Sequence, residues 1–406
     1  MNMNDKADAV TKPKQRKLLF SAGLSWMFDA MDVGLISFII AALAAEWSLL
    51  PEQTGLFTSI NSIGMAVGAA ISGILADKYG RKAILLWTLL IFSVASGLSA
   101  LATSFTVLCL LRFVAGFGLG GELPVASTLV SESVPAKERG RAVVLLESFW
   151  AAGWILSALI AYFVIPKYGW QAAFILGAVP ALYALYLRKS IQDPPRYVRS
   201  TERLTLGQSF MSVWASPHRK STIMLWILWF TVVFSYYGMF LWLPTVMGLK
   251  GFSLVKSFEY VLIMTLAQLP GYFTAAYLIE KLGRKFVLVV YLLLTAVSAA
   301  WFGNATSEGM LIAAGMCLSF FNLGAWGGMY AYTPELYPTS VRSTGVGLAA
   351  SFGRVGGIIA PFMVGMLVAR QVQIGSIFWI FFVTILIGAA AVLWLGTETK
   401  GKELID

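Results

Sequence analysis

The chain has 406 residues, of which 58% are hydrophobic and only 12% are charged, about half of the charged share of a soluble globular protein. A soluble fold of this size could not hide so much apolar surface from water. The composition therefore excludes a water-soluble enzyme and indicates an integral membrane protein. A net charge of +10 can indicate a protein that binds nucleic acid. It can also result from basic loops on one side of a membrane.

Twelve apolar stretches, each long enough to cross a bilayer as a helix, follow one another along the chain. They cover residues 18–44, 55–75, 83–102, 106–130, 142–165, 171–188, 221–247, 257–279, 286–303, 309–333, 345–369 and 376–395. Short polar turns join most of them, and the one long connection is 189–220. We therefore predict an all-α integral membrane protein with twelve transmembrane helices.

The basic residues gather on one side of the predicted membrane. Of the 30 lysines and arginines, 24 fall in tails and loops on the side of the N-terminus, four fall on the opposite side, and Arg112 and Arg354 lie within spans. The positive-inside rule then predicts a multi-pass protein of the plasma membrane with both termini in the cytoplasm. The basic excess is explained by this topology, so no nucleic-acid partner is expected.

The two halves of the chain repeat each other at a shift of 203 residues. Residues 73–82 (GILADKYGRK) then align with 276–285 (AYLIEKLGRK), and residues 132, 135 and 139 (Glu, Pro, Arg) align with 335, 338 and 342 without a gap. Both copies begin on the same side of the membrane, which is the arrangement of a parallel repeat. We expect an N-terminal six-helix bundle in 1–188, a cytoplasmic linker in 189–220 and a C-terminal six-helix bundle in 221–406.

These motifs resemble those of the major facilitator superfamily over the whole chain. Residues 73–82 are similar to its signature between the second and third helices, and residues 112–121 (RFVAGFGLGG) to its fourth-helix motif. Within the superfamily, residues 29–32 (DAMD), 120–124 (GGELP), 147–150 (ESFW) and 236–244 (YYGMFLWLP) look most like bacterial niacin permeases of the NiaP type. That group is near the organic-ion and aromatic-acid proton symporters. The fifth span lacks the Gly-Pro motif of many drug antiporters, which argues against drug efflux.

Six ionisable side chains fall inside the predicted spans, where each costs about 2.5–3.5 kcal/mol at a helix centre. They are Asp29, Asp32, Arg112, Glu122, Glu147 and Arg354. Such groups are tolerated when they pair with one another or face water inside the protein. The sequence therefore predicts a water-filled cavity between the two bundles.

Two of these acids are candidates for proton coupling. Asp29 and Asp32 are three residues apart, so they share a helix face, and two carboxylates at that separation disfavour joint ionisation. The resemblance implies that the acid matching Asp32 pairs with the arginine matching Arg112, and that protonation of the acid releases the pair. Our hypothesis is that Asp32 carries the coupled proton, and that the neighbouring carboxylate of Asp29 adjusts how readily Asp32 takes up this proton. The alternative is a permanent structural ion pair.

Arg354 is the candidate anchor for an anionic cargo. It aligns with Ala151 in the other half, and its planar guanidinium suits a carboxylate. An alternative is that Arg354 pairs with a carboxylate of a cytoplasmic gate. The other candidate substrate-binding residues are Glu122, Glu147, Trp150, Trp154, Tyr236, Tyr237, Gln268, Asn322, Trp326 and Tyr330. Their rings recur at helical spacing and could flank a flat aromatic acid, although helix packing or lipid contact is the alternative for each.

The repeated loops predict a cytoplasmic gate. Its candidate residues are Gly73, Asp77, Gly80, Arg81, Glu132, Arg139, Glu280, Arg284, Glu335 and Arg342. By resemblance, the charged members form ion pairs and helix-terminus contacts that hold the two bundles together on this side, chiefly in the outward-facing state. Gly80 fits a tight turn between spans. The alternative is that these groups serve only topology and folding.

We therefore expect a secondary active transporter that takes up nicotinate with a proton by alternating access, as a monomer among membrane lipids. No catalytic residue, metal or cofactor is expected, and no P-loop motif points to ATP. The alternatives are a proton symporter of another aromatic acid or organic ion, or a membrane sensor without flux. A membrane enzyme is disfavoured by one loop histidine, His218, and two distant cysteines.

Overall fold

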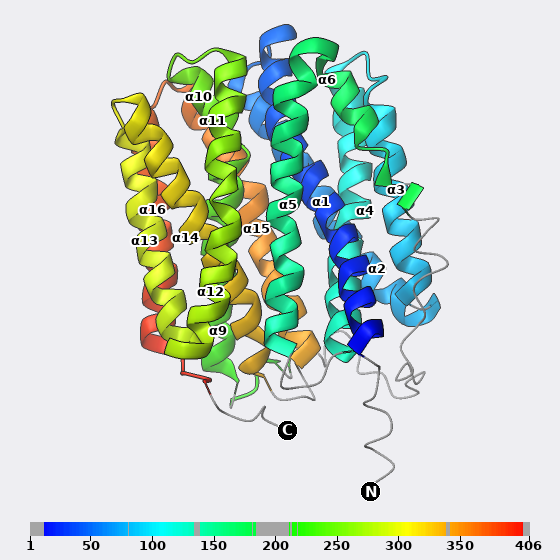
Figure 1. Cartoon of the computed structure of the whole chain (residues 1–406), viewed down its shortest axis with the longest axis vertical. Helices are drawn as coiled ribbons and strands as arrows, with labels where there is room; N and C mark the ends of the chain where they lie inside the picture. Colours follow the sequence, from blue (N-terminus) through cyan, green and yellow to red (C-terminus); the bar gives the residue numbers. More distant parts are fainter. Residues whose placement is uncertain are drawn as a thin grey trace, which may run out of the picture.

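The computed structural model describes residues 12–79, 81–133, 139–180, 182–183, 211, 213–216, 218–337 and 342–400. Within the helices, the description leaves out the side chains of residues 12–18, 70, 73–79, 81–82, 85, 121–133, 139–144 and 342–344. In the described part every regular element is a helix, and the longest helices run along the long axis of the molecule (Figure 1). The predicted all-α fold is confirmed.

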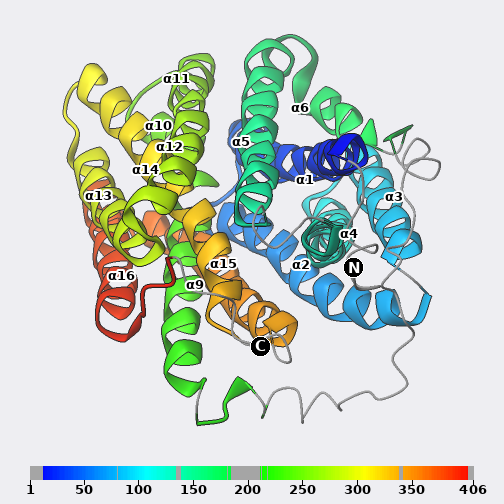
Figure 2. The ribbon, with the colours of Figure 1, turned by 60° about the horizontal axis from the view of Figure 1, so that its bottom comes forward.

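The helices form two groups that lie side by side, as the tilted view of Figure 2 shows. The N-terminal group contains α1 (Lys12–Glu46), α2 (Pro51–Tyr79), α3 (Arg81–Ser99), α4 (Phe105–Ser133), α5 (Arg139–Phe163) and α6 (Ile165–Leu176). The C-terminal group contains α9 (Arg219–Phe240), α10 (Leu243–Leu249), α11 (Leu254–Leu266), α12 (Gln268–Leu282), α13 (Arg284–Asn304), α14 (Glu308–Glu335), α15 (Arg342–Ala369) and α16 (Ile374–Leu395). Most of the predicted linker, 189–220, lies outside the described residues.

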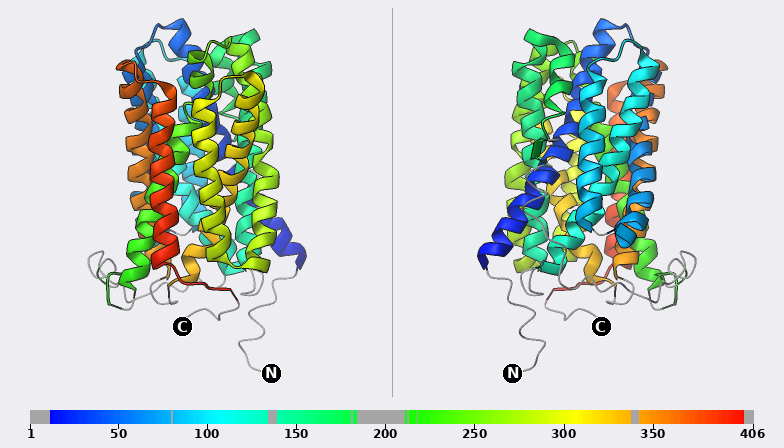
Figure 3. Two further views of the ribbon diagram at one scale, coloured as in Figure 1. Left: turned by 90° about the vertical axis from the view of Figure 1, so that its left-hand side faces the viewer. Right: turned by 90° about the vertical axis from the view of Figure 1, so that its right-hand side faces the viewer.

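Both ends of the described chain lie at the same end of the bundle, which we call the termini end; the opposite end is the far end (Figures 1 and 3). Among the described residues, eight segments are long and apolar enough to cross a membrane. Large apolar side chains such as Trp87 and Trp394 are exposed on the outside of the bundle. Such surfaces are stable against lipid rather than water, so this is a multi-pass membrane protein.

Three predicted spans differ from the structure, each near a proline or a glycine. The stretch 221–247 is interrupted: α9 ends at Phe240, and α10 restarts with Pro244 in its first turn. The stretch 257–279 is divided at Ala267 into α11 and α12, because Pro270 has no N–H to donate to the preceding turn. The stretch 171–188 instead begins with α6 at Ile165, which is kinked at Gly169, where φ is 78°.

The two groups pack closely at the far end, where α2 meets α15. A Cβ atom on Gly55 would lie 2.9 Å from the carbonyl oxygen of Pro361 and 3.2 Å from the Cα atom of Gly365. The Ser59 hydroxyl donates a hydrogen bond of 2.8 Å to the carbonyl of Ile358. Backbones this close leave no passage between these two helices at the far end.

Candidate functional site

Asp32 and Arg112 form a buried ion pair inside the N-terminal group. Arg112 Nη1 lies 3.2 Å from Asp32 Oδ2 and 3.4 Å from Oδ1, and both residues are fully buried. The Ser96 hydroxyl donates to Asp32 Oδ1 at 2.5 Å, and Arg112 Nη2 donates to the Ser99 hydroxyl at 2.9 Å. Both charges are therefore neutralised and hydrogen-bonded, which buried ions require.

The helices α3 and α6 complete this site with residues that sequence reasoning missed. Ser96 and Ser99 lie one turn apart on α3 and face the pair, and the guanidinium of Arg112 stacks over the ring of Phe174, 4.6 Å from its centre. The spacing of the two serines is a signal that could have found them, since serines three apart in an apolar helix share a face. Nothing in the sequence pointed to Phe174.

Asp29 is also buried, with 2% of its surface exposed, but it does not share the surroundings of Asp32. It is close enough to Tyr237 of α9 to interact with it electrostatically, whereas Asp32 faces α3 and α4. The expectation that both acids look into one central cavity is not met by Asp32, whose carboxylate faces Ser96 and Arg112. Residues three apart on a helix point about 60° away from each other, which is enough to turn the second carboxylate toward its own bundle.

A small cavity lies between the two groups of helices. Its lining is mostly aromatic and contains one charge. The lining residues are Trp26, Met65, Trp150, Trp229, Val233, Tyr237, Trp326, Tyr330, Ala350 and Arg354. Five predicted substrate-binding residues are among them: Trp150, Tyr237, Trp326, Tyr330 and Arg354.

Arg354 enters this cavity from α15 and meets the other group of helices there. Its Nη1 lies 3.5 Å from the sulfur of Met65 on α2, and no described carboxylate lies within ion-pair distance of it. Gly353 and Gly356 beside it let α15 approach α9: a Cβ on Gly356 would lie 2.7 Å from the carbonyl oxygen of Phe230. These glycines therefore serve helix packing, and the guanidinium, which also interacts with the hydroxyl of Tyr237, has no anionic partner among the described residues.

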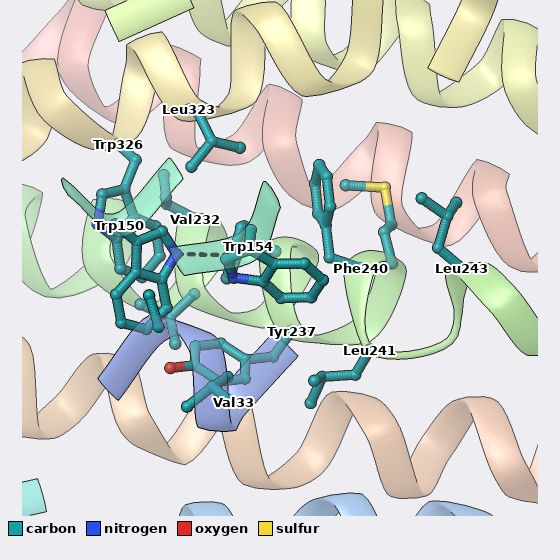
Figure 4. Close-up of a cluster of buried hydrophobic side chains, with 14 of the residues drawn as sticks. Val33, Trp150, Trp154, Val232, Tyr237, Phe240, Leu241, Leu243, Leu323 and Trp326 are labelled. Atoms are coloured by element: carbon teal, nitrogen blue, oxygen red, sulfur yellow. Dashed lines mark hydrogen bonds between the residues drawn. The ribbon is translucent and has the colours of Figure 1, made fainter. Parts of the chain in front are cut away.

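The predicted aromatic residues pack against one another in the interior. Trp150 and Trp326 stack at an interplanar angle of 15° with ring centres 6.3 Å apart, and Trp150 donates a 2.6 Å hydrogen bond to the hydroxyl of Tyr236. Trp154 contacts Tyr236 and Phe240 edge-on, and the cluster is drawn in Figure 4. Trp150, Trp154 and Trp326 are each at most 4% exposed, so these rings do not face lipid.

The cavity is closed down in this conformation. Its volume of about 20 Å³ holds roughly one or two water molecules. A flat ring with a carboxylate is several times larger. Binding such a cargo therefore requires the surrounding side chains or helices to move apart.

Three further predicted residues, Glu147, Gln268 and Asn322, are buried but do not line the cavity. The carboxylate oxygens of Glu147, both amide atoms of Gln268 and the amide oxygen of Asn322 form no hydrogen bond. The indole N–H groups of Trp26 and Trp326 interact with Glu147, although neither completes a hydrogen bond of ordinary length and angle. Sequence reasoning missed Tyr272 of α12, which interacts with Glu147 and whose hydroxyl also lacks a partner.

At the termini end, the described gate residues form contacts within the C-terminal group. Arg284 pairs with Glu280 at 3.0 Å and with Glu335 at 3.2 Å. The Thr399 hydroxyl donates to Glu335 at 2.5 Å. Among the described side chains, these three gate residues form no hydrogen bond or ion pair with the N-terminal group.

The segment after α16 caps the start of α13, a feature that sequence reasoning missed. The Glu398 carboxylate accepts hydrogen bonds from the backbone N–H groups of Arg284 and Lys285, at 2.9 and 3.1 Å, and from those of Thr399 and Lys400. Burial opposes ionisation of Glu398, but these donors outweigh it and hold its pKa below the ordinary value. The carboxylate sits at a helix N-terminus, where negative charge is favoured.

Several predicted residues lie outside the described part of the chain. Gly80 is one. The side chains of the others are not described: Gly73, Asp77, Arg81, Glu122, Glu132, Arg139 and Arg342. Their assignment to the gate, or for Glu122 to the substrate site, stays a prediction.

Comparison with known proteins gives a consistent answer. The sequence pattern of the Major Facilitator Superfamily matches residues 20–271 and 260–405. The chain is 61% identical to a Bacillus subtilis (strain 168) protein provisionally named niacin/nicotinamide transporter NiaP, over 96% of this chain and 98% of that one. It is 45% identical to the niacin transporter NiaP of Acinetobacter baylyi, over 95% of both chains.

Solved structures share the fold. The proton:xylose symporter XylE bound to a bromodeoxyglucose superimposes with a TM-score of 0.77 at 19% identity, over 97% of this chain and 98% of that one. A bacterial homologue of the human lysosomal transporter Spinster gives 0.75 at 18% identity, over 95% and 97%. With the family match and the nearly full-length relatives, these structures confirm the twelve-helix fold. The chain belongs to the major facilitator superfamily and is a membrane transporter, not an enzyme.

Proposed function

We propose that this transporter takes up nicotinate together with a proton by alternating access. The observation that carries the proposal is the cavity between the two groups of helices, where Arg354 stands among tryptophan and tyrosine rings. No described carboxylate neutralises it. The names of the relatives at 61% and 45% identity support niacin as the cargo.

The chemistry of the cavity suits an aromatic carboxylate. The guanidinium of Arg354 can donate two parallel N–H bonds to a carboxylate. The rings of Trp150, Trp326 and Tyr330 offer flat apolar surfaces, and stacking on one such ring is worth about 0.5–1.5 kcal/mol beyond area burial. A sugar would leave the positive charge without a counter-ion.

Alternating access would open the cavity toward one end at a time. The distribution of basic residues supports a cytoplasmic location of the termini end; the far end, closed where Gly55 meets Gly365, would then face outward. The structure then corresponds to an outward-closed state with a collapsed cavity. Opening the far end requires α2 and α15 to separate. In alternating access, the termini end closes when the far end opens.

Asp32 is the proposed carrier of the coupled proton. Protonation of Asp32 would remove the charge that holds Arg112, and the α1 helix could then shift. Trp26 lies on the same helix and lines the cavity, so a movement of α1 released at Asp32 reaches the cargo site. One proton with one nicotinate anion makes transport electroneutral, driven by the pH gradient; a net charge would add about 2.3 kcal/mol per 100 mV.

The test is uptake of labelled nicotinate by purified protein in liposomes. A pH gradient, acid outside, should drive accumulation without a current. Asp32→Asn should abolish accumulation against a gradient and spare exchange of nicotinate across the membrane. Accumulation that survives this substitution would make the Asp32–Arg112 pair purely structural.

The same assay separates the competing functions. Binding of nicotinate without flux would indicate a sensor. Equal competition by benzoate would indicate a general carrier of aromatic acids. Lack of any thermal stabilisation by nicotinate would reject niacin as the cargo, since a ligand that binds the folded state raises its apparent stability.

A further inference from the structure

Four buried polar side chains without a hydrogen bond in the described part of the chain come from three helices that pack against one another, two of which also line the aromatic cavity. These helices are α5, α12 and α14, and we call the group of four side chains the polar cluster. It consists of Glu147, Gln268, Tyr272 and Asn322. Each is at most 2% exposed, and the carboxylate of Glu147, the amide of Gln268, the hydroxyl of Tyr272 and the amide oxygen of Asn322 all lack a hydrogen bond among the described residues.

Such a concentration of unsatisfied groups is unusual for a protein interior. Buried polar side chains are hydrogen-bonded in the large majority of cases, and the cost of leaving them unpaired is higher where the surroundings are lipid and packed apolar side chains. Asp32 shows that this chain can satisfy a buried carboxylate when it must. Apart from the indoles of Trp26 and Trp326 beside Glu147, the hydrogen-bond partners of the polar cluster therefore have to come from outside the protein, as water or as cargo.

The polar cluster is adjacent to the cavity that holds Arg354. Trp26 and Trp326 line that cavity, and their indoles also interact with Glu147. Tyr272 interacts with Glu147 and Tyr330, and Tyr330 is in turn close to both Glu147 and Arg354. Tyr330 therefore lies near both the acid and the arginine.

The local backbone also singles out this position. The predicted eighth span breaks at Ala267, directly before Gln268, and Gln268 and Tyr272 lie one turn apart on the same face of α12. Asn322 and Trp326 have the same spacing on α14. Broken transmembrane helices are a common way in which transporters build a midplane binding site.

We propose that the polar cluster binds the ring nitrogen of a pyridine carboxylate, while Arg354 binds the carboxylate at the other side of the ring. This inference rests on the proposed function. The lone pair of a pyridine nitrogen needs a donor. The Gln268 amide and the Tyr272 hydroxyl supply donors, and a protonated Glu147 would supply another. A benzene ring would leave these groups buried and unpaired, so the polar cluster selects nicotinate over benzoate.

The experiment compares nicotinate and benzoate as competitors of labelled nicotinate uptake in liposomes. The wild-type protein should prefer nicotinate by about tenfold or more, the effect of one buried hydrogen bond. Glu147→Leu and Gln268→Leu should each reduce the ratio toward one, by weakening nicotinate and sparing benzoate. Tyr272→Phe removes one hydroxyl and provides a milder variant that keeps the packing.

A matched control removes a buried polar group elsewhere in the same group of helices. Thr295→Val on α13 deletes a fully buried hydroxyl that bonds only to the carbonyl of Tyr291, and it should leave the ratio unchanged. An unchanged ratio in Gln268→Leu and Tyr272→Phe would overturn the proposal.

Failure of the proposed function gives a different result. If the wild-type protein neither transports nor is stabilised by nicotinate, the cargo assignment is wrong. If it transports nicotinate and benzoate equally well, the Arg354 anchor stands and the polar cluster has no role in selecting the ring. Each outcome decides one of the two proposals separately.

Discussion

Asp32 and Glu147 are both buried carboxyl groups in membrane-spanning helices, yet their surroundings differ completely. Asp32 pairs with Arg112 and accepts from Ser96. Glu147 has no cation and no complete hydrogen bond among the described residues. The first arrangement is self-sufficient within one bundle, and the second is completed only by something that enters from outside. A buried acid in a membrane span thus marks a functional site. Whether that site is an internal ion pair or a binding site for something from outside depends on the partners of the acid.

The largest expected effect is on the self-sufficient pair. Arg112→Met leaves the Asp32 carboxylate buried without a counter-charge, which destabilises a fold by about 3–5 kcal/mol. A large fall in the apparent melting temperature in detergent should follow. The double variant Asp32→Asn with Arg112→Met should recover most of it, since neither charge then remains. An equal fall in melting temperature in the single and the double variant would show that the unpaired charge of Asp32 is not the cause.

Arg354 should behave in the opposite way, with a large effect on binding and a small one on folding. Arg354→Met removes the hydrogen bonds to the carboxylate, and since one such bond to a charged group is worth about 1.5–3 kcal/mol, nicotinate affinity should fall by at least about tenfold to a hundredfold. Arg354→Lys should retain only part of the nicotinate affinity, because an ammonium group cannot form the paired N–H contacts with a carboxylate. Nicotinate-dependent thermal shifts measure both. Arg370→Met, at an exposed arginine near the far end, is the control.

Glu147→Leu sharpens the contrast with Arg112. Replacing a buried polar group that has no partner by an apolar one of similar size is close to neutral, so the apparent stability should change by less than about 1 kcal/mol. Melting in detergent without nicotinate checks this. A loss as large as that of Arg112→Met would show that Glu147 has an internal partner.

The smallest effect on stability is expected at Glu398, an acid whose carboxylate is hydrogen-bonded but lies outside the membrane spans. Because its pKa is lowered in the folded protein, its ionised form stabilises the fold above the ordinary value of 4.5, and this stabilisation is lost as the pH falls through the lower folded value. Glu398→Gln should therefore lower the melting temperature slightly at neutral pH and not at strongly acidic pH. A constant difference across this range would rule out the charge as the cause.

Much of the architecture could be predicted from the sequence because hydropathy is a local property. The apolar stretches located the spans, and the motifs at 73–82 and 112–121 pointed to the family. The breaks at Ala267 and near Pro244 were missed because an apolar run of the right length does not reveal where a helix is interrupted. Pro270 was the available signal.

The sequence also singled out which side chains matter, since charged and amide groups are rare and expensive within spans. It could not assign their partners. That Arg354 contacts Met65, 289 residues away, that Glu398 caps α13, and that Asp32 turns away from the central cavity all depend on how the helices pack against one another. Composition and hydropathy act residue by residue, whereas neutralisation of a buried charge depends on groups brought together from distant parts of the chain, and only the tertiary structure decides which they are.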